Sequence, residues 1–121
     1  MIEMTVYLCR TYVVKVGKLK EHNRWGKKLV AIMKKKPVLF KGVKSLQVLS
    51  HDGSVDKFTA MWGFKDMLDV EGWEKGFVEI PEEKAMREEF MELIEPGSFS
   101  VQVLRPIKTL KRNIKAKNSK K

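Results

Sequence analysis

Four stretches of the chain alternate apolar with polar residues and are rich in β-branched and aromatic side chains, a pattern typical of β-strands. They span residues 4–16, 43–50, 55–64 and 98–107. Asp52 and Gly53 lie between the second and third stretches, and this dipeptide is a strong hairpin signal. The pattern therefore predicts four strands, of which the middle two pair as an antiparallel hairpin.

Two further stretches show the spacing of three and four between apolar residues that indicates amphipathic helices. The first spans residues 18–35 and stops before Pro37. The second begins after Asp66, a residue that favours the N-cap position, and is broken or restarted at Pro81. The order β-α-β-β-α-β predicts an α+β, ferredoxin-like fold, with an antiparallel sheet that carries its helices on one face.

The two faces of the predicted sheet differ in a way that bears on assembly. The face expected beneath the helices carries Val6, Leu8, Tyr12, Val14, Leu46, Val48, Phe58, Ala60, Trp62, Phe64, Phe99, Val101 and Val103. The opposite face carries Thr5, Tyr7, Cys9, Thr11, Val13, Val43, Leu49, Thr59, Met61, Gln102 and Leu104. This second face is mostly neutral and about half apolar, so a second copy stacked sheet on sheet is its simplest cover. An ordinary mixed solvent face is the alternative.

Length and charge divide the chain into a body and a tail. Its 121 residues suit one domain, which we place at residues 1–107, followed by a basic, disordered tail at 108–121. The formal net charge of +10 is unevenly spread. Residues 1–51 carry 12 basic and 2 acidic side chains, residues 52–104 carry 5 and 13, and residues 105–121 carry 8 and none. The body is therefore bipolar and almost neutral, and most of the excess charge lies at the C-terminal end.

Several classes of protein are excluded by what the sequence lacks. Cys9 is the single cysteine and the two histidines, His22 and His51, are far apart, so neither a disulfide nor a metal site is expected. No Walker loop, Gly-rich dinucleotide turn or nucleophile elbow occurs, so no cofactor is expected. No apolar run approaches the length of a membrane span and no secretory signal is evident. We therefore expect a cytoplasmic protein.

In three sequence features the chain resembles the dimeric α+β barrel superfamily, and within it the antibiotic-biosynthesis-monooxygenase branch. They are Val16-Gly17-Lys18 after the first strand, FTAMWGF at residues 58–64, and Trp73 in the acidic helix that follows. The resemblance covers about residues 4–107. It implies a homodimer whose two sheets form a shared barrel, a ligand cleft between each sheet and its own helices, and a cofactor-independent, monooxygenase-like activity on an aromatic or apolar substrate.

Haem-degrading members of this superfamily use an Asn, a Trp and a His together. By the resemblance, Arg10 stands at the Asn position and Trp73 near the Trp, whereas the stretch that should supply the His contains Glu82 and Glu83. Only the Trp matches, so haem degradation is not carried over to this chain.

Arg10 is the most informative candidate residue, because alternation places it between Leu8 and Tyr12 on the helix-covered face. A guanidinium in that position needs a partner, since an unpaired buried charge is costly. It could grip an anionic ligand in the cleft through its fork of donors. Alternatively, it pairs with an acidic residue of the second helix, or a bulge turns it outward.

Aromatic residues and one histidine complete the candidate ligand-binding set. We assign Arg10, Tyr12, His22, Phe58, Trp62, Trp73 and Phe77 to it. The aromatic side chains could line a pocket or simply form the core. His22 could act as a general base, or it is a packed, hydrogen-bonded residue at the edge of the core.

The excess positive charge supports a second functional hypothesis. The basic helix and the tail could bind nucleic acid or another anionic partner, although a solvated tail is the plainer interpretation. RNA-recognition modules share this order of elements, but they need an exposed aromatic platform. The exposed positions here are Lys57, Thr59, Met61 and Gly63, which offer none. No nucleic-acid motif therefore supports this alternative.

Overall fold

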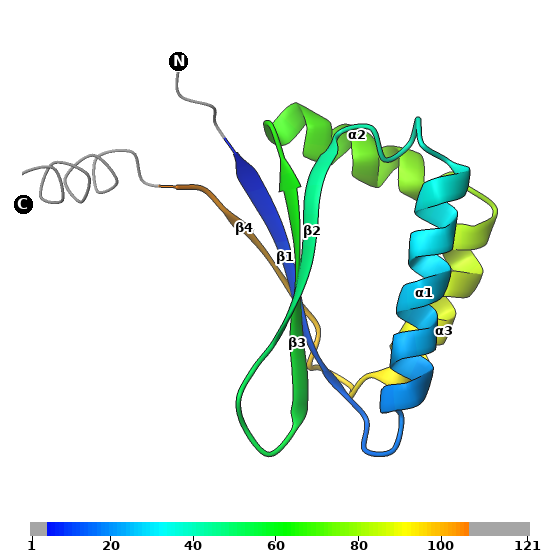
Figure 1. Cartoon of the computed structure of the whole chain (residues 1–121), viewed down its shortest axis with the longest axis vertical. Coiled ribbons are helices and arrows are strands. Elements are labelled where there is room, and N and C mark those ends of the chain that lie inside the picture. Colours follow the sequence, from blue (N-terminus) through cyan, green and yellow to red (C-terminus); the bar gives the residue numbers. More distant parts are fainter. Residues whose placement is uncertain (1–4, 107–121) are drawn as a thin grey trace, which may run out of the picture.

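A computed structural model describes residues 5–106 and shows a four-stranded sheet with three helices on one of its faces (Figure 1). In chain order the elements are β1 (Val6–Val14), α1 (Leu19–Lys35), β2 (Val43–Ser50), β3 (Asp56–Phe64), α2 (Met67–Val78), α3 (Glu82–Leu93) and β4 (Ser100–Leu104). The strand order is β2-β3-β1-β4, and each neighbouring pair is antiparallel. The predicted α+β, ferredoxin-like fold is confirmed.

The stretch after β3 forms two helices, whereas the predicted order of elements contained one helix there. Asp66 caps α2 as expected, because its Oδ1 accepts a hydrogen bond from the backbone N–H of Asp69 at 3.0 Å. The last turn of α2 tightens, with Ile80 N donating to Phe77 O at 3.3 Å. Pro81 then precedes the first residue of α3, a position that suits its fixed φ.

The core lies between the sheet and the helices, as the alternation predicted. In the β1–β3 register Leu8 faces Trp62, Arg10 faces Ala60 and Tyr12 faces Phe58, so these side chains share one face. The main buried cluster consists of Val6, Leu8, Leu29, Ile32, Phe40, Trp62, Phe64, Val70, Trp73 and Met86. All three helices therefore contribute to packing against the two central strands.

The outer strands depart from the predicted burial. Val48 on β2, together with Phe99, Val101 and Val103 at β4, was expected beneath the helices, yet these side chains are exposed by 37–54%. Their partners in the register, such as Ala60 for Val48 and Arg10 for Val101, lie on the helix side. The predicted face is therefore correct for these four residues, but the helices cover the centre of the sheet and leave its margins open. Val43 was predicted on the opposite face and instead packs against the main core, because the register shifts between Val43 and Ser45. Residue 107, the predicted end of the last strand, and the tail lie outside the described residues.

A second buried cluster closes the other end of the fold. It consists of Tyr12, Val14, Phe90 and Ile94. Two backbone bonds fasten the end of α3 to β1 there, from Lys15 N to Leu93 O at 2.9 Å and from Glu95 N to Val13 O at 2.8 Å.

A buried pair of polar side chains, Tyr12 and His22, joins this second cluster to α1. The hydroxyl of Tyr12 lies 2.7 Å from Nε2 of His22, and Nδ1 of His22 lies 3.1 Å from Oδ1 of Asn23. An amide oxygen only accepts, so Nδ1–H of His22 donates to Asn23, and Nε2 shares the second hydrogen bond with the Tyr12 hydroxyl. Burial raises the pKa of Tyr12 to about 12.

Two glycines interrupt α2, and the structure distinguishes them. A Cβ added at Gly72 would meet nothing within 4 Å, whereas one added at Gly76 would lie 2.7 Å from Cδ1 of Leu39. Gly76 therefore allows the loop before β2 to approach the helix closely, while no packing contact requires a glycine at position 72.

We predict opposite outcomes for alanine at these two positions. Gly72→Ala should raise the free energy of unfolding by about 1 kcal/mol, because alanine loses less backbone entropy in a helix. Gly76→Ala should give no such gain, since Leu39 must move away from the new methyl group. Urea unfolding of both variants measures the difference. Equal stabilisation by the two substitutions would contradict the close approach at Gly76.

Tyr12 should also make stability depend on pH in the alkaline range. The fold raises the pKa of this phenol from 10.0 to about 12, so the folded state holds its proton more tightly than the unfolded chain. The resulting stabilisation, roughly 3 kcal/mol, is complete below pH 10 and is lost as the pH rises through about 12. Tyrosinate absorbance should therefore show a late transition that Tyr12→Phe removes and Tyr7→Phe retains. A late transition that survives in Tyr12→Phe would contradict the assignment.

Candidate functional site

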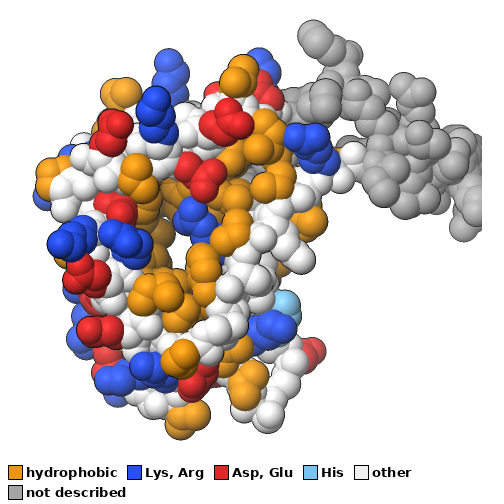
Figure 2. Space-filling model, turned by 180° about the vertical axis from the view of Figure 1, so that it is seen from behind, with side chains coloured by type: hydrophobic (Ala, Val, Ile, Leu, Met, Phe, Trp, Pro, Cys, Tyr) orange, Lys and Arg blue, Asp and Glu red, His pale blue; other side chains and the backbone are white. Residues whose placement is uncertain are grey.

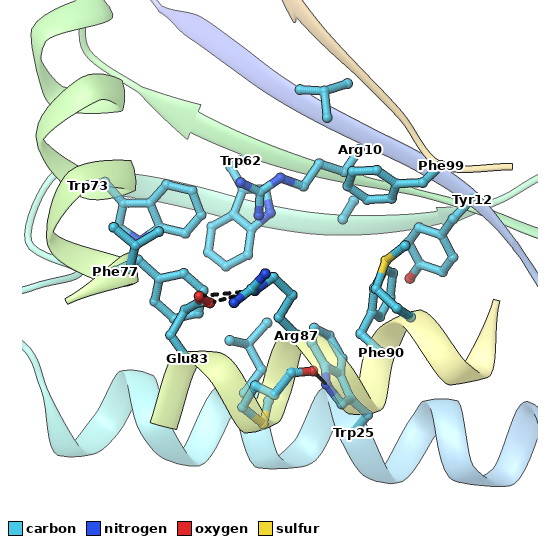
Figure 3. Close-up of a pocket in the computed structure, with 16 residues that line it drawn as sticks. Arg10, Tyr12, Trp25, Trp62, Trp73, Phe77, Glu83, Arg87, Phe90 and Phe99 are labelled. Atoms are coloured by element: carbon cyan, nitrogen blue, oxygen red, sulfur yellow. Dashed lines mark hydrogen bonds and ion pairs between the residues drawn. The ribbon is translucent and has the colours of Figure 1, made fainter. Parts of the chain in front are cut away.

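A cavity of about 620 Å³ lies between the sheet and the helices (Figure 3). Seen from behind, the molecule is hollowed near its centre, and hydrophobic side chains border the hollow (Figure 2). The sheet contributes Arg10, Tyr12, Ala60, Trp62 and Val101, Phe99 lies just before β4, and the helices contribute Trp25, Leu29, Trp73, Phe77, Val78, Glu83, Met86, Arg87, Phe90 and Met91. The space is therefore enclosed by all three helices and opens toward β4.

Aromatic side chains form the wall at the α2 end of the cavity. The ring centroids of Trp62 and Trp73 are 4.7 Å apart, and Phe77 stacks on Trp73 at 5.6 Å with an angle of 8° between the rings. Trp62 and Trp73 are almost fully buried. Contacts of this kind hold each ring in place, so this wall is preformed.

Trp25 stiffens the other end of the cavity. Its Nε1 donates a hydrogen bond to the carbonyl oxygen of Met86 at 2.8 Å, and its ring lies 4.8 Å from that of Phe90. Because Trp25 belongs to α1 and the other two residues to α3, this contact ties the two helices together. The chain has three tryptophans, and all of them line the cavity.

Arg10 brings a positive charge into this aromatic enclosure. Its guanidinium carbon lies 5.1 Å from the centre of the Trp73 ring, a cation–π contact, and Nη2 lies 3.9 Å from Oε2 of Glu74. Burial lowers the pKa of Arg10, and the nearby charge of Glu74 opposes that effect. The expected acidic partner from the helix after β3 is therefore Glu74, but it is too distant for a hydrogen bond.

A second guanidinium lies in the wall formed by α3. Nε of Arg87 lies 3.2 and 3.1 Å from the two carboxylate oxygens of Glu83. The side chain of Glu83 is only 8% exposed, whereas that of Arg87 is 63% exposed. Glu83 is therefore neutralised inside the fold by a residue that reaches toward solvent.

Five of the seven residues assigned from the sequence line the cavity, namely Arg10, Tyr12, Trp62, Trp73 and Phe77. The other two do not line it. His22 lies behind Tyr12, bonded to its hydroxyl, and Phe58 stacks on the His22 ring at 4.9 Å. His22 is thus packed and hydrogen-bonded within the fold, beside the site rather than in it.

The sequence-based assignment missed Trp25, Glu83 and Arg87. A signal for the first was present, because Trp25 lies three residues after His22 and four before Leu29 on one helical face. Glu83 lies three residues before Met86, on the apolar stripe of α3. An acidic side chain on such a stripe is itself a sign of a buried ion pair.

The other chemically notable residues of the described chain lie outside this cavity. No group of three or more potential metal ligands occurs among residues 5–106. None of the helices in the described part of the chain is long and apolar enough to cross a membrane. Cys9 is buried, and His51 bonds through Nε2 to the hydroxyl of Thr59 at 2.7 Å on the face of the sheet away from the helices. The basic tail, which the nucleic-acid hypothesis needs, lies outside the described residues.

Comparisons with solved structures show the same fold in several proteins. A NIPSNAP family protein from Agrobacterium tumefaciens superposes with a TM-score of 0.71, at 22% identity, over 88% of this chain and 90% of its own. A NIPSNAP-like domain protein from Burkholderia xenovorans gives 0.68 at 20% identity, with 88% of each chain covered. A putative antibiotic biosynthesis monooxygenase from Nitrosomonas europaea gives 0.65 at 9% identity, over 88% of this chain and 94% of its own.

The sequence itself identifies the family. No functionally curated protein matches the chain. Residues 7–111 match the family model described as NIPSNAP, and this range contains all three helices, the cavity and every strand except the first residue of β1. The resemblance to the antibiotic-biosynthesis-monooxygenase branch agrees with the shared fold. The chain is a member of the NIPSNAP family.

Proposed function

We propose that this NIPSNAP protein binds a small, mostly apolar or aromatic ligand in the cavity between its sheet and its helices. The observation that carries the proposal is a space of about 620 Å³ walled by three tryptophans and further aromatic side chains. Cavities of some 300–1,000 Å³ with apolar walls and few polar groups are typical of small-molecule sites.

The rim of the cavity supports the same proposal. Val78, Met91 and Val101 line it and are exposed by 64%, 52% and 49%. Trp25 and Phe77 also line the cavity and are half-buried, so this part of the lining is an apolar surface that water reaches. A bound apolar body would cover much of this surface, and its removal from water is the driving force for binding.

A monooxygenase-like reaction is an extension of this proposal, and it comes from the resemblance alone. The side chains with free donors that a substrate would meet are the guanidinium groups of Arg10 and Arg87, since the Tyr12 hydroxyl is bonded to His22. Both could orient an oxygen-bearing ring between the aromatic walls. Oxygen uptake in the presence of a bound aromatic ligand is the measurement that separates a catalyst from a binding protein.

We also propose that the face of the sheet away from the helices is covered by a second copy of this chain. Tyr7, Cys9 and Met61 are half-buried or buried there, and the hydroxyls of Thr11 and Thr59 bond to each other at 2.9 Å. Leu49 and Leu104 remain 46% and 48% exposed. A neutral, partly apolar face with its hydroxyls paired internally suits stacking of sheet on sheet.

The ligand proposal predicts binding of a neutral apolar probe, N-phenyl-1-naphthylamine, with an increase in probe fluorescence. Ala60→Phe should weaken that binding by about tenfold or more, because the added ring fills part of the cavity. The control is Val16→Phe, which adds a ring at a position 95% exposed and outside the cavity. Failure of the wild-type protein to bind the probe, or equal binding by Ala60→Phe, would contradict the proposal.

The dimer proposal predicts a mass of about 28 kDa by light scattering at micromolar concentration, twice the 14.1 kDa chain. Met61→Lys should shift the protein toward the monomer, because it places a charge on the proposed interface. Val48→Lys, on the helix side of the sheet, should leave the mass unchanged. A wild-type mass near that of a single chain would refute the proposal.

A further inference from the structure

We propose that the ligand of this cavity is a monocarboxylate with an aromatic or apolar body, and that Arg10 pairs with its carboxylate. The inference rests on the proposed function and names the class of ligand. It starts from an imbalance between the two arginines of the site, since one has a close partner inside the protein and the other does not.

Arg87 is the paired arginine. Its Nε contacts both oxygens of Glu83 at 3.1–3.2 Å, so the buried carboxylate already has a hydrogen-bonded counter-charge. Within residues 5–106 the terminal nitrogens of Arg87 have no further hydrogen bond. Glu83 is thus neutralised and leaves little negative charge to repel an anion in the cavity.

Arg10 is the under-paired arginine. Its side chain is 26% exposed, yet no hydrogen bond from its guanidinium to another described residue is present, and Glu74 lies 3.9 Å away with a side chain 48% exposed. Water screens an interaction with so exposed a carboxylate. The ring of Trp73 attracts the guanidinium through a cation–π contact. This contact does not use the N–H groups that point outward in the plane of the guanidinium. The donors of Arg10 are therefore available to a ligand.

The position of Arg10 defines what such a ligand looks like. The guanidinium enters from the sheet beside Trp62 and Trp73, while Arg87 enters from the α3 wall (Figure 3). An anionic group at Arg10 would have aromatic walls on its inner side and the apolar rim on its outer side. The remainder of the ligand must then be apolar, because Arg10, Arg87 and Glu83 are the only charged residues that line the cavity within the described chain.

The form of the charge favours a carboxylate. A guanidinium fork matches the two oxygens of a carboxylate in a bidentate pair. Arg10 and Arg87 balance Glu74 and Glu83 in formal charge, so a dianion such as a phosphate monoester would leave two uncompensated charges in a largely apolar space. A monocarboxylate adds only one negative charge to this space, and Arg10 contacts that charge directly.

The test compares two ligands of the same shape, 2-naphthoic acid and 2-naphthamide, by isothermal titration calorimetry at neutral pH. The wild-type protein should bind the acid about tenfold to a hundredfold more tightly than the amide, as expected for charge-assisted hydrogen bonds. Arg10→Gln should abolish this preference while amide binding is retained. Arg24→Gln, an exposed arginine on α1, is the matched control and should keep the preference.

Glu74→Gln separates a ligand-binding arginine from a purely structural ion pair. If Arg10 pairs with the ligand, loss of the competing carboxylate should strengthen binding of the acid and leave the amide unaffected. If the Arg10–Glu74 pair serves only the fold, the variant should lose stability and show no change in the preference. Circular dichroism and N-phenyl-1-naphthylamine binding confirm that each variant retains its fold and cavity.

Three results would overturn the inference while leaving the proposed function in place, provided the neutral probe still binds. They are equal affinity for acid and amide in the wild type, an acid preference that survives in Arg10→Gln, and tighter binding of 2-naphthyl phosphate than of the acid. Loss of binding for the neutral probe as well would instead overturn the proposed function. The two failures are therefore distinguishable.

Discussion

The packing of Trp73 between α2 and the centre of the sheet is the contact on which the site depends. This side chain is 2% exposed and lies against Trp62, Phe64 and Phe77, with ring centroids 4.7–5.6 Å apart. It fixes how far α2 stands from the strands, because an indole is too large to let the helix settle closer. The same ring provides the face over which Arg10 lies. One aromatic residue thus determines the height of the cavity and the surroundings of its charge.

The opposite end of the fold is held in a different way. There the Tyr12–His22 hydrogen bond, the Phe58–His22 stack and two backbone bonds at the end of α3 act together with Trp25, which packs against Phe90. Hydrogen bonds of this kind are directional and leave little freedom to the elements that they join. The cavity therefore lies between an anchor made of packed rings and one that combines ring packing with hydrogen bonds.

The sequence predicted the fold well because its signals are local. The hairpin at Asp52-Gly53, the cap at Asp66 and the alternation in β1 all act within a few residues, and each appears in the structure. Alternation also placed Arg10 on the correct face. It also gave the correct face for Val101 and Val103 but not their burial, since their exposure depends on how far the helices extend across the sheet, and no pattern within β4 encodes that distance.

The site was predictable only where one element carried the information. Tyr12 and Trp62 follow from strand alternation, whereas Glu83 and Arg87 enter the cavity through the way α3 packs beside α1 and α2. Phe58 has the correct face but lies behind His22, so its assignment to the site depended on a contact between β3 and α1. Contacts between elements distant in the chain decide such cases.

The placement of all three tryptophans on the cavity wall has a consequence for spectroscopy. Every indole chromophore of the chain reports on the same small volume, so intrinsic fluorescence follows the contents of the cavity with no background from tryptophans elsewhere. The same property makes the signal ambiguous during unfolding, since filling the cavity and dismantling it both alter the surroundings of the same three rings. A second signal, such as backbone circular dichroism, is needed to separate occupancy from folding.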